Sequence, residues 1–283
     1  MIPARLKDEE LLNEVERFAD DKNNFHLWWL GQSGYLITWN NERLLLDPYL
    51  SDSLTVKYAS TNKPHVRMSE RVIDPALLKN ISVVTSSHNH TDHLDGETLV
   101  PVLKNNPGIK FIIPEANRKF VCERVKCDEQ FPIGLDSGKS TTVGSFTFYG
   151  VPASHNEIEK DEQGRYKFMG YVIRFGNWTI YHSGDTLIYE GMAGLLKPYQ
   201  IDLALLPING NDPARGVAGN LNAREAVELG KSIGNGMIIP CHYDMFTFNT
   251  ADPVVFAGIA EDAGISYEVL LPGGHFSSTA LPH

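Results

Sequence analysis

The residues of this chain that could do chemistry are concentrated in one short segment. Three histidines and one aspartate fall within six residues, directly after the apolar run 81–86: His88, His90, Asp92 and His93. Residues two apart in an extended segment lie on the same side, so the first two histidines point the same way, and Asp92 and His93 begin a turn that can face the same point. Neutral imidazoles and a carboxylate are suitable ligands for a divalent ion such as zinc. The segment therefore predicts a metal site.

A metal site needs ligands from more than one loop, and distant parts of the chain offer them. Three more candidates each follow an apolar, β-rich run at the point where it gives way to a polar loop: His155, Asp185 and His242. Strand ends of this kind are where layered α/β proteins build their sites. We therefore expect these residues to join the first cluster.

In these residues and their order, the chain resembles the metallo-β-lactamase-fold hydrolase superfamily. The pattern is His-x-His-x-Asp-His at 88–93, followed by a later His, an Asp in Ser-Gly-Asp, and a final His. The likeness runs from about Trp28 to His242. Within the superfamily it is greatest to the L-ascorbate-6-phosphate lactonase group. The segments that carry this second likeness are 29–31, 181–185, 211–216, 239–246 and 251–253.

The resemblance implies a cage for two divalent metal ions. The implied sets are His88, His90 and His155 for one ion, and Asp92, His93 and His242 for the other, with Asp185 bridging both. Members of the superfamily use zinc, manganese or iron, and the related lactonases use manganese. Asp47 matches a position that supports the metal loop through hydrogen bonds and does not itself bind metal.

Two ions in such a cage can share one water, lower its pKa toward neutrality and supply hydroxide as the nucleophile. A serine or cysteine nucleophile is then unnecessary. Asp92 is our candidate to orient the hydroxide and to move its proton. His182, three residues before Asp185, is a candidate to protonate the leaving group. The alternative for His182 is a structural role, since a histidine ending a β run is often a hydrogen-bonded structural group.

Substrate selection is expected to come from the loops. Arg215 lies in a Gly- and Asn-rich segment that resembles a lactonase stretch, and its guanidinium could clamp a phosphate or carboxylate bidentately. Asn209 and Asn211 could add amide contacts. The alternative is that all three are ordinary residues of a surface turn. Lys63 and His65, with the neighbouring Arg67, are predicted to form the edge of a lid.

The leading hypothesis is a metal-dependent hydrolase of a small anionic substrate, with a lactone or ester as the scissile group. A phosphodiesterase or phospholipase-type hydrolase on the same fold is the alternative. A di-iron redox protein and a metal-binding protein without turnover are further alternatives. The formal charge of −10 disfavours long nucleic acid as a partner, because it repels a phosphate backbone.

The elements that must position these residues follow from hydrophobic periodicity. Early β-rich runs come as hairpins, and later ones alternate with helix-like stretches. This order predicts an α/β fold, namely a four-layer αββα sandwich of two mixed β-sheets with helices on the outer faces. Helices are expected at 7–21, 96–104, 116–125, 221–233 and 253–263. Strands are expected at 25–30, 35–39, 43–47, 81–86, 110–113, 142–152, 168–175, 178–182, 201–207, 236–240 and 266–271.

The whole chain, 1–283, is predicted to be one domain, because no linker or repeat interrupts it. With 42% hydrophobic and 21% charged residues, the composition excludes disorder, collagen and coiled coil. The charged N-terminal stretch has no apolar signal region, and no run approaches the roughly 20 apolar residues of a membrane span, so we expect a cytoplasmic protein. The sequence is compatible with a homo-oligomer. Segments 51–74 and 156–167 are predicted to be long surface loops.

Overall fold

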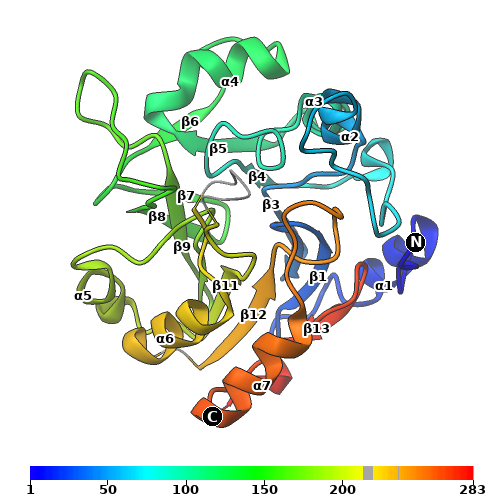
Figure 1. Ribbon diagram of the computed structural model, residues 1–283. Helices are drawn as coiled ribbons and strands as arrows, with labels where there is room; N and C mark the ends of the chain where they lie inside the picture. Colours follow the sequence, from blue (N-terminus) through cyan, green and yellow to red (C-terminus); the bar gives the residue numbers. More distant parts are fainter. Residues whose placement is uncertain (213–218, 235, 283) are drawn as a thin grey trace.

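The computed structural model describes residues 1–212, 219–234 and 236–282, and within these the strands form two mixed sheets (Figure 1). The seven-stranded sheet has the order β13-β1-β2-β3-β4-β5-β6, and the six-stranded sheet has the order β12-β11-β10-β9-β8-β7. The first sheet contains β1 (His26–Gly31), β2 (Gly34–Trp39), β3 (Glu42–Leu46), β4 (Val83–Thr85), β5 (Lys110–Pro114), β6 (Ile133–Leu135) and β13 (His275–Ser277). The second contains β7 (Ser140–Val143), β8 (Phe146–Pro152), β9 (Met169–Phe175), β10 (Trp178–His182), β11 (Leu203–Pro207) and β12 (Met237–Cys241).

Alternation of side chains along each strand divides the first sheet between two cores. On β1, Leu27 and Trp29 belong to the core between the sheets, whereas Trp28 and Leu30 belong to the core beneath the outer helices. This period of two is the geometric consequence of an extended backbone. Because both faces of the strand are covered, it reads as a continuous hydrophobic run and not as an alternating one.

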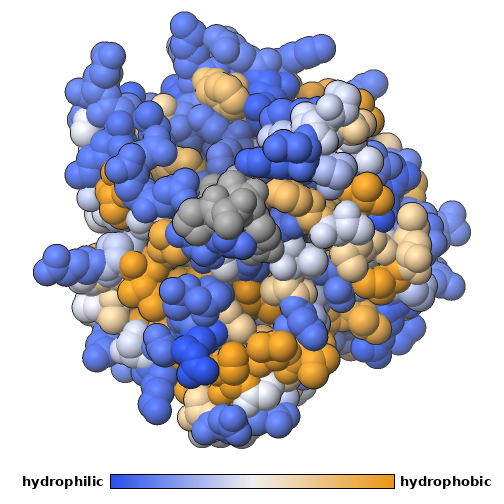
Figure 2. All heavy atoms as spheres, in the orientation of Figure 1, coloured by the Kyte–Doolittle hydropathy of each residue, from blue (hydrophilic) through white to orange (hydrophobic). Residues whose placement is uncertain are grey.

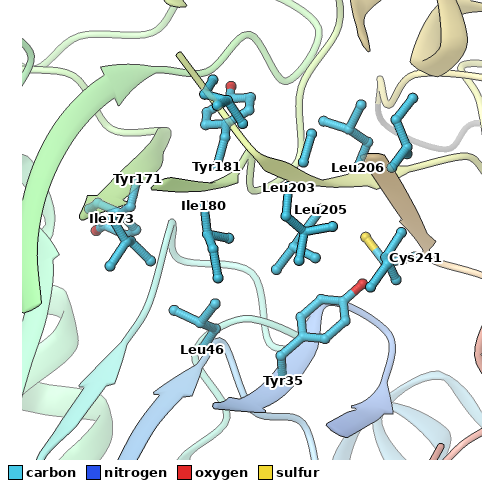
Figure 3. Packing of buried hydrophobic residues seen from close by; sticks show 14 of the residues in the cluster. Tyr35, Leu46, Tyr171, Ile173, Ile180, Tyr181, Leu203, Leu205, Leu206 and Cys241 are labelled. Carbon is cyan, nitrogen blue, oxygen red and sulfur yellow. The ribbon is translucent and has the colours of Figure 1, made fainter. Parts of the chain in front are cut away.

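The core between the sheets is built from large apolar side chains of both layers. Figure 3 shows Leu46 of the first sheet beneath Ile180 of the second, and Tyr35 pointing toward Cys241. Each fully buried side chain of this size stabilises the fold by about 1.5–3 kcal/mol relative to an exposed one. The resulting double sheet supports the loops at its edge.

Helices cover the outer face of each sheet, which confirms the predicted αββα sandwich (Figure 1). Beside the first sheet lie α1 (Glu9–Arg17), α3 (Gly96–Asn105) and α4 (Arg118–Val125); beside the second lie α5 (Met192–Leu196), α6 (Ala223–Ile233) and α7 (Pro253–Ala263). Their ends follow from local chemistry. At the start of α6, Asn222 and Glu225 form a reciprocal capping box, and Gly234 ends the helix in the left-handed conformation.

The topology brings distant loops to one edge of the sandwich. Strands β3, β4 and β5 run parallel, and so do β10, β11 and β12. The carboxyl ends of parallel neighbours lie at the same edge of their sheet. The loops that follow β4, β10 and β12 carry the predicted ligands of segment 88–93, Asp185 and His242, so these loops can meet there.

Three local predictions differ from the structure. The predicted strand 142–152 is a hairpin of β7 and β8, because Gly144 adopts a positive φ of 55° and turns the chain. The predicted strand 266–271 forms only an isolated bridge between Tyr267 and Ile238, although half-buried and exposed residues alternate along it. The predicted loop 51–74 contains the short helix α2 (Ser53–Tyr58). None of the helices found in the described residues has the length and apolar character needed to cross a membrane.

Candidate metal centre

The structure brings all seven predicted ligands together in two adjoining clusters. Within each cluster the candidate ligand atoms lie within 4.8 Å of one another. The first contains His88, His90, His155 and Asp185, and the second contains Asp92, His93, Asp185 and His242. The grouping is the one that the family resemblance implies.

Asp185 belongs to both clusters and turns one carboxylate oxygen toward each. Its Oδ1 lies 2.8 Å from His242 Nε2 and 3.1 Å from His93 Nε2. Its Oδ2 lies 3.9 Å from His88 Nε2. Gly184 directs the chain into this position with a φ of +59°, and a Cβ added there would lie 2.7 Å from the Met169 carbonyl oxygen. The Ser-Gly-Asp segment therefore has a steric reason for its glycine.

The donor set fits divalent cations. His88 Nε2 and His155 Nε2 are buried and have no hydrogen-bond partner in the described part of the chain. Buried polar atoms are normally satisfied, so such a convergence of acceptors calls for a cation. His93 Nε2 and His242 Nε2 lie 3.3 Å apart. Tetrahedral ligands at zinc distances are separated by about 3.4 Å, so this spacing needs little adjustment.

Asp47 lies under hydrogen-bonding groups of segment 85–93, the surroundings in which the sequence analysis expected it. It is fully buried, and its Oδ2 lies 2.8 Å from His93 Nδ1 and accepts a hydrogen bond from Ser87 N at 3.1 Å. Its Oδ1 accepts from Thr85 Oγ1 at 2.7 Å. A carboxylate on Nδ1 fixes the ring so that Nε2 faces the centre.

Other ligands have similar supports, some of which the sequence analysis missed. Nδ1 of His155 donates to the Gly219 carbonyl oxygen at 2.9 Å. Gln32 Nε2 donates to Asp92 Oδ2 at 2.9 Å and lies 3.2 Å from His242 Nδ1. Gln32 occupies the turn between β1 and β2 with a positive φ of 51°. In the sequence, the signal for this residue was a glutamine in a glycine-flanked turn between two apolar runs.

The electrostatics of the clusters favour cation binding. Burial lowers the pKa of His88 and of His90, which keeps both rings neutral as metal ligands must be. Burial also disfavours charge on His93, but the Asp185 and Asp92 carboxylates outweigh it and raise the pKa of His93 well above its usual value. Although burial opposes ionisation of Asp185, the His242 and His93 rings hold its pKa well below the usual range. The clusters therefore offer neutral imidazoles at His88 and His90 and an ionised carboxylate at Asp185.

A pocket of about 480 Å³ opens over both clusters. His90, Asp92, His155 and Asp185 contribute to its lining. The rest of the lining is aromatic, apolar, amide, hydroxyl or basic, and comprises Gln32, Leu54, Lys57, Tyr58, Lys63, His65, Asn89, Thr91, Phe120, Arg124, Phe246, Phe248 and Asn249. The pocket is of a size for a small-molecule substrate.

Neither of the two predicted substrate-binding asparagines lines the pocket. Asn209 is buried, and its amide is bound to Asn249 at 2.8 Å and to Asn220 at 3.0 Å. It is Asn249 that lines the pocket, so Asn209 positions that residue and is not itself a lining group. Asn211 is exposed and does not line the pocket. Arg215 lies outside the described residues.

His182 is not placed to protonate a leaving group. It is 1% exposed, it does not line the pocket, and its Nε2 lies 3.0 Å from the Ser33 carbonyl oxygen. The last residue of β10 points into the sandwich because the side chains alternate along the strand. The structural alternative for His182 therefore describes its surroundings better.

The three residues predicted to form a lid edge differ in their relation to the pocket. Lys63 and His65 line the pocket, and His65 stacks on Tyr58 with ring centroids 4.5 Å apart. Arg67 does not line it, because its Nε donates to Asp52 Oδ1 at 2.7 Å and its guanidinium lies over the Tyr49 ring.

Two of the remaining histidines form a separate chain of contacts near α1. His275 Nε2 lies 3.0 Å from His26 Nδ1, and His26 Nε2 lies 3.1 Å from Asp21 Oδ2. Phe18 stacks on His26 with centroids 4.0 Å apart. Burial lowers the pKa of His275 from 6.5 to about 4, although Glu14 opposes the shift.

This depressed pKa predicts a pH-dependent stability. Between about pH 4 and 6.5 the unfolded chain binds more protons at His275 than the folded chain, so acidification lowers the free energy of unfolding. Allowing for solvent screening of a half-buried ring, we expect a loss of roughly 1–2 kcal/mol across this range. Urea unfolding of metal-free protein at pH 4.5, 5.5 and 7 should show a shallower dependence in His275→Gln. An identical dependence in both proteins would contradict the assignment.

The fold and site place the chain in a known superfamily. A model of the beta-lactamase superfamily domain matches residues 42–243, and the chain therefore belongs to the metallo-β-lactamase superfamily. Among its relatives, it is 27% identical over 250 residues to a UPF0173 metal-dependent hydrolase of Saccharolobus solfataricus, covering 87% of this chain and 96% of the relative. It is 28% identical over 245 residues to a UPF0173 metal-dependent hydrolase of Nanoarchaeum equitans, with 86% and 94% covered.

Solved structures agree on the fold. Igni18, a metallo hydrolase from Ignicoccus hospitalis, superposes with a TM-score of 0.65 at 22% identity and covers 90% of this chain and 98% of its own. The isothiocyanate hydrolase from Delia radicum gut bacteria superposes with a TM-score of 0.69 at 17% identity, with 89% and 100% covered. A likeness at these identities supports the architecture and leaves the reaction to be argued from the site.

Proposed function

We propose that this protein is a metal-dependent hydrolase of a small anionic substrate, with a lactone or an ester as the scissile group. The observation that carries the proposal is the pair of His/Asp clusters that share Asp185 beneath a pocket of small-molecule size. The names of the UPF0173 relatives support hydrolysis with a metal. The finer choice of lactone or ester rests on the resemblance to the ascorbate-6-phosphate lactonase group.

The clusters would hold two divalent ions, with zinc or manganese as our first choices and iron as a third. When bound, such ions supply a nucleophilic hydroxide at neutral pH and a Lewis acid for the developing oxyanion. Asp92 lines the pocket and accepts a hydrogen bond from Gln32, so its carboxylate is oriented to take up a proton and pass it to the leaving group. Lys57 and Arg124 give the pocket a positive wall that attracts an anion.

Metal content is the direct test. Elemental analysis of purified protein should show close to two ions per chain, and His90→Ala should lose about one because it removes a ligand of the first cluster only. His65→Ala is the matched control, since His65 lines the same pocket outside both clusters. Metal-free protein whose activity is indifferent to chelators would refute the proposal.

The reaction is then chosen by assay. Metal-loaded protein is offered sugar lactones, aryl esters and bis-aryl phosphates, and we expect the first two classes to be hydrolysed faster. Hydrolysis of bis-aryl phosphates alone would select the phosphodiesterase alternative. An iron absorption band without hydrolysis would select a redox protein.

A further inference from the structure

Arg124 reaches from α4 to the metal-binding segment. Its Nη1 donates to the carbonyl oxygens of Asn89 at 2.8 Å and Leu94 at 3.1 Å. The ring of Phe120 covers the guanidinium, with 4.5 Å between Cζ and the ring centroid. These contacts hold the guanidinium in one place beside segment 88–93. A group fixed in this way loses little conformational entropy when it binds a ligand.

The guanidinium keeps donors that the protein does not use. A guanidinium has five N–H donors, and the hydrogen bonds of Arg124 to other described residues involve Nη1 alone. Across the described ranges, no carboxylate pairs with Arg124, whereas Arg43, Arg118 and Arg165 each have an acidic partner. Asp95 lies nearby, but its oxygens are bound to Ser53 and Thr98. Nε and Nη2 of Arg124 are thus available to an external anion.

On its pocket side, Arg124 has a second basic residue near it. Arg124 and Lys57 both line the pocket over the clusters, and the acidic residues that share this lining are the cluster members Asp92 and Asp185. With Thr91, the two basic residues also line an adjoining hollow, so they stand where the two spaces meet. The surface over α4 is mostly hydrophilic, as Figure 2 shows.

Another part of the pocket lining is aromatic. Tyr58, Phe246 and Phe248 contribute aromatic rings, and His65 packs against all three. A ligand that contacts both the basic residues and the aromatic rings carries an oxyanion at one end and an apolar or planar portion beside these rings.

We infer that Arg124 and Lys57 bind the oxyanion of the substrate, a carboxylate or a phosphate, and thereby set specificity for anionic over neutral esters and lactones. Arg124 engages the anion bidentately through Nε and Nη2, and Lys57 acts as a second point charge. The inference rests on the proposed function, because it assigns the substrate-binding residues of the same site.

The test compares two esters of similar length that differ in charge. 4-Nitrophenyl hemisuccinate carries a carboxylate, and 4-nitrophenyl butyrate is neutral. In metal-loaded Arg124→Gln we expect KM for the hemisuccinate to rise about 10- to 100-fold, as for loss of a charged bidentate contact, and kcat/KM for the butyrate to change less than about threefold. The rise in KM for the hemisuccinate should be smaller in Arg124→Lys than in Arg124→Gln. It should also be smaller in Lys57→Gln. Competition by inorganic phosphate and by succinate indicates which oxyanion binds better.

The matched control is Arg174→Gln. Arg174 also donates to a backbone carbonyl, that of Tyr199 at 3.0 Å, and packs on the rings of Tyr149 and Tyr199, but it does not line the pocket. It should leave both substrates unaffected. Metal content is measured in every variant, because Arg124 also contacts the metal-binding segment.

An inert pair separates anion binding from turnover. The anilides N-(4-nitrophenyl)succinamate and N-(4-nitrophenyl)butyramide are titrated calorimetrically into metal-loaded protein. The inference is supported if the wild type binds the anionic anilide more tightly than the neutral one and if Arg124→Gln weakens that binding at least tenfold. This holds even if neither ester is hydrolysed. The absence of hydrolysis would count against the proposed function alone. Equal affinity for the two anilides in the wild type overturns the inference. An equal loss of affinity for both anilides in Arg124→Gln also overturns it, because that result would indicate a purely structural role for Arg124. If Arg124→Gln fails to fold, the affinities for the two anilides are compared in the same way in Arg124→Lys and Lys57→Gln.

Discussion

Asp185→Asn is expected to empty both metal clusters and to lower kcat on the order of 10³-fold or more, about 4 kcal/mol of barrier. The carboxylate presents Oδ1 to His93 and His242 and Oδ2 to the first cluster. Asparagine has nearly the same volume, so the surrounding packing survives. The substitution removes the negative charge and one of the two oxygens that the clusters share. Metal content by elemental analysis and hydrolysis rate are measured on the same sample.

The control for this variant is Asp202→Asn. Asp202 is a half-buried aspartate, and its Oδ2 accepts a hydrogen bond from Thr179 N at 2.7 Å, away from both clusters. It should keep the metal content and the rate of the wild type. If Asp185→Asn retained two ions per chain, the bridging position assigned to Asp185 would be wrong.

The candidate ligands that the structure brings together could be identified from the sequence because each belongs to a local pattern. The cluster at 88–93 follows one apolar run, and His155, Asp185 and His242 follow three others. The change from apolar to polar residues shows where such a strand ends, and strand ends lie at an edge of the sheet. Distance along the chain was therefore no obstacle to placing the candidates at one edge of the sandwich.

The supports of the ligands could not be predicted in this way. Gln32 donates to Asp92 across 60 positions of sequence, and no local pattern joins the two residues. Arg124 has the spacing of an ordinary surface charge on a helix, and its contact with the Asn89 carbonyl depends on how α4 packs. Asp47 was anticipated because the family resemblance identified its position. Side-chain networks of this kind depend on tertiary contacts more than on periodicity.

The errors in secondary structure have the same origin. The segment 266–271 has an alternating pattern, but it pairs with β12 around Ile238 alone, whereas β13 at His275–Ser277 pairs with β1 over three residues. Pairing to a neighbouring strand decides which extended segment becomes a strand, and pairing is not visible in local composition. Helix α7, by contrast, has its N-terminus marked by Asp252 and its C-terminus by Gly264 and was predicted with correct bounds.

Asp47 is the support whose loss should have the largest effect on the fold. Asp47→Ala leaves Thr85 Oγ1, Ser87 N and His93 Nδ1 without their common acceptor in a fully buried place. Breaking a buried charged network by removing one partner costs about 3–5 kcal/mol. Alanine also tolerates poorly the φ of 37° at this position. We expect the free energy of unfolding of metal-free protein, measured in urea, to fall by that amount.

Asp47→Asn separates the stability of the fold from the chemistry of the ligand. Asparagine accepts the left-handed backbone and keeps one oxygen for the buried donors, so its stability loss should be the smaller, about 1–2 kcal/mol. Its amide N–H can face His93 Nδ1, however, which would place the ring proton on Nε2 and block the ligand atom. Metal affinity, measured by competition with a chromophoric chelator, should therefore fall about 10- to 100-fold in both variants. An asparagine variant with wild-type metal affinity would contradict the role of Asp47 in fixing the His93 tautomer, whatever its stability.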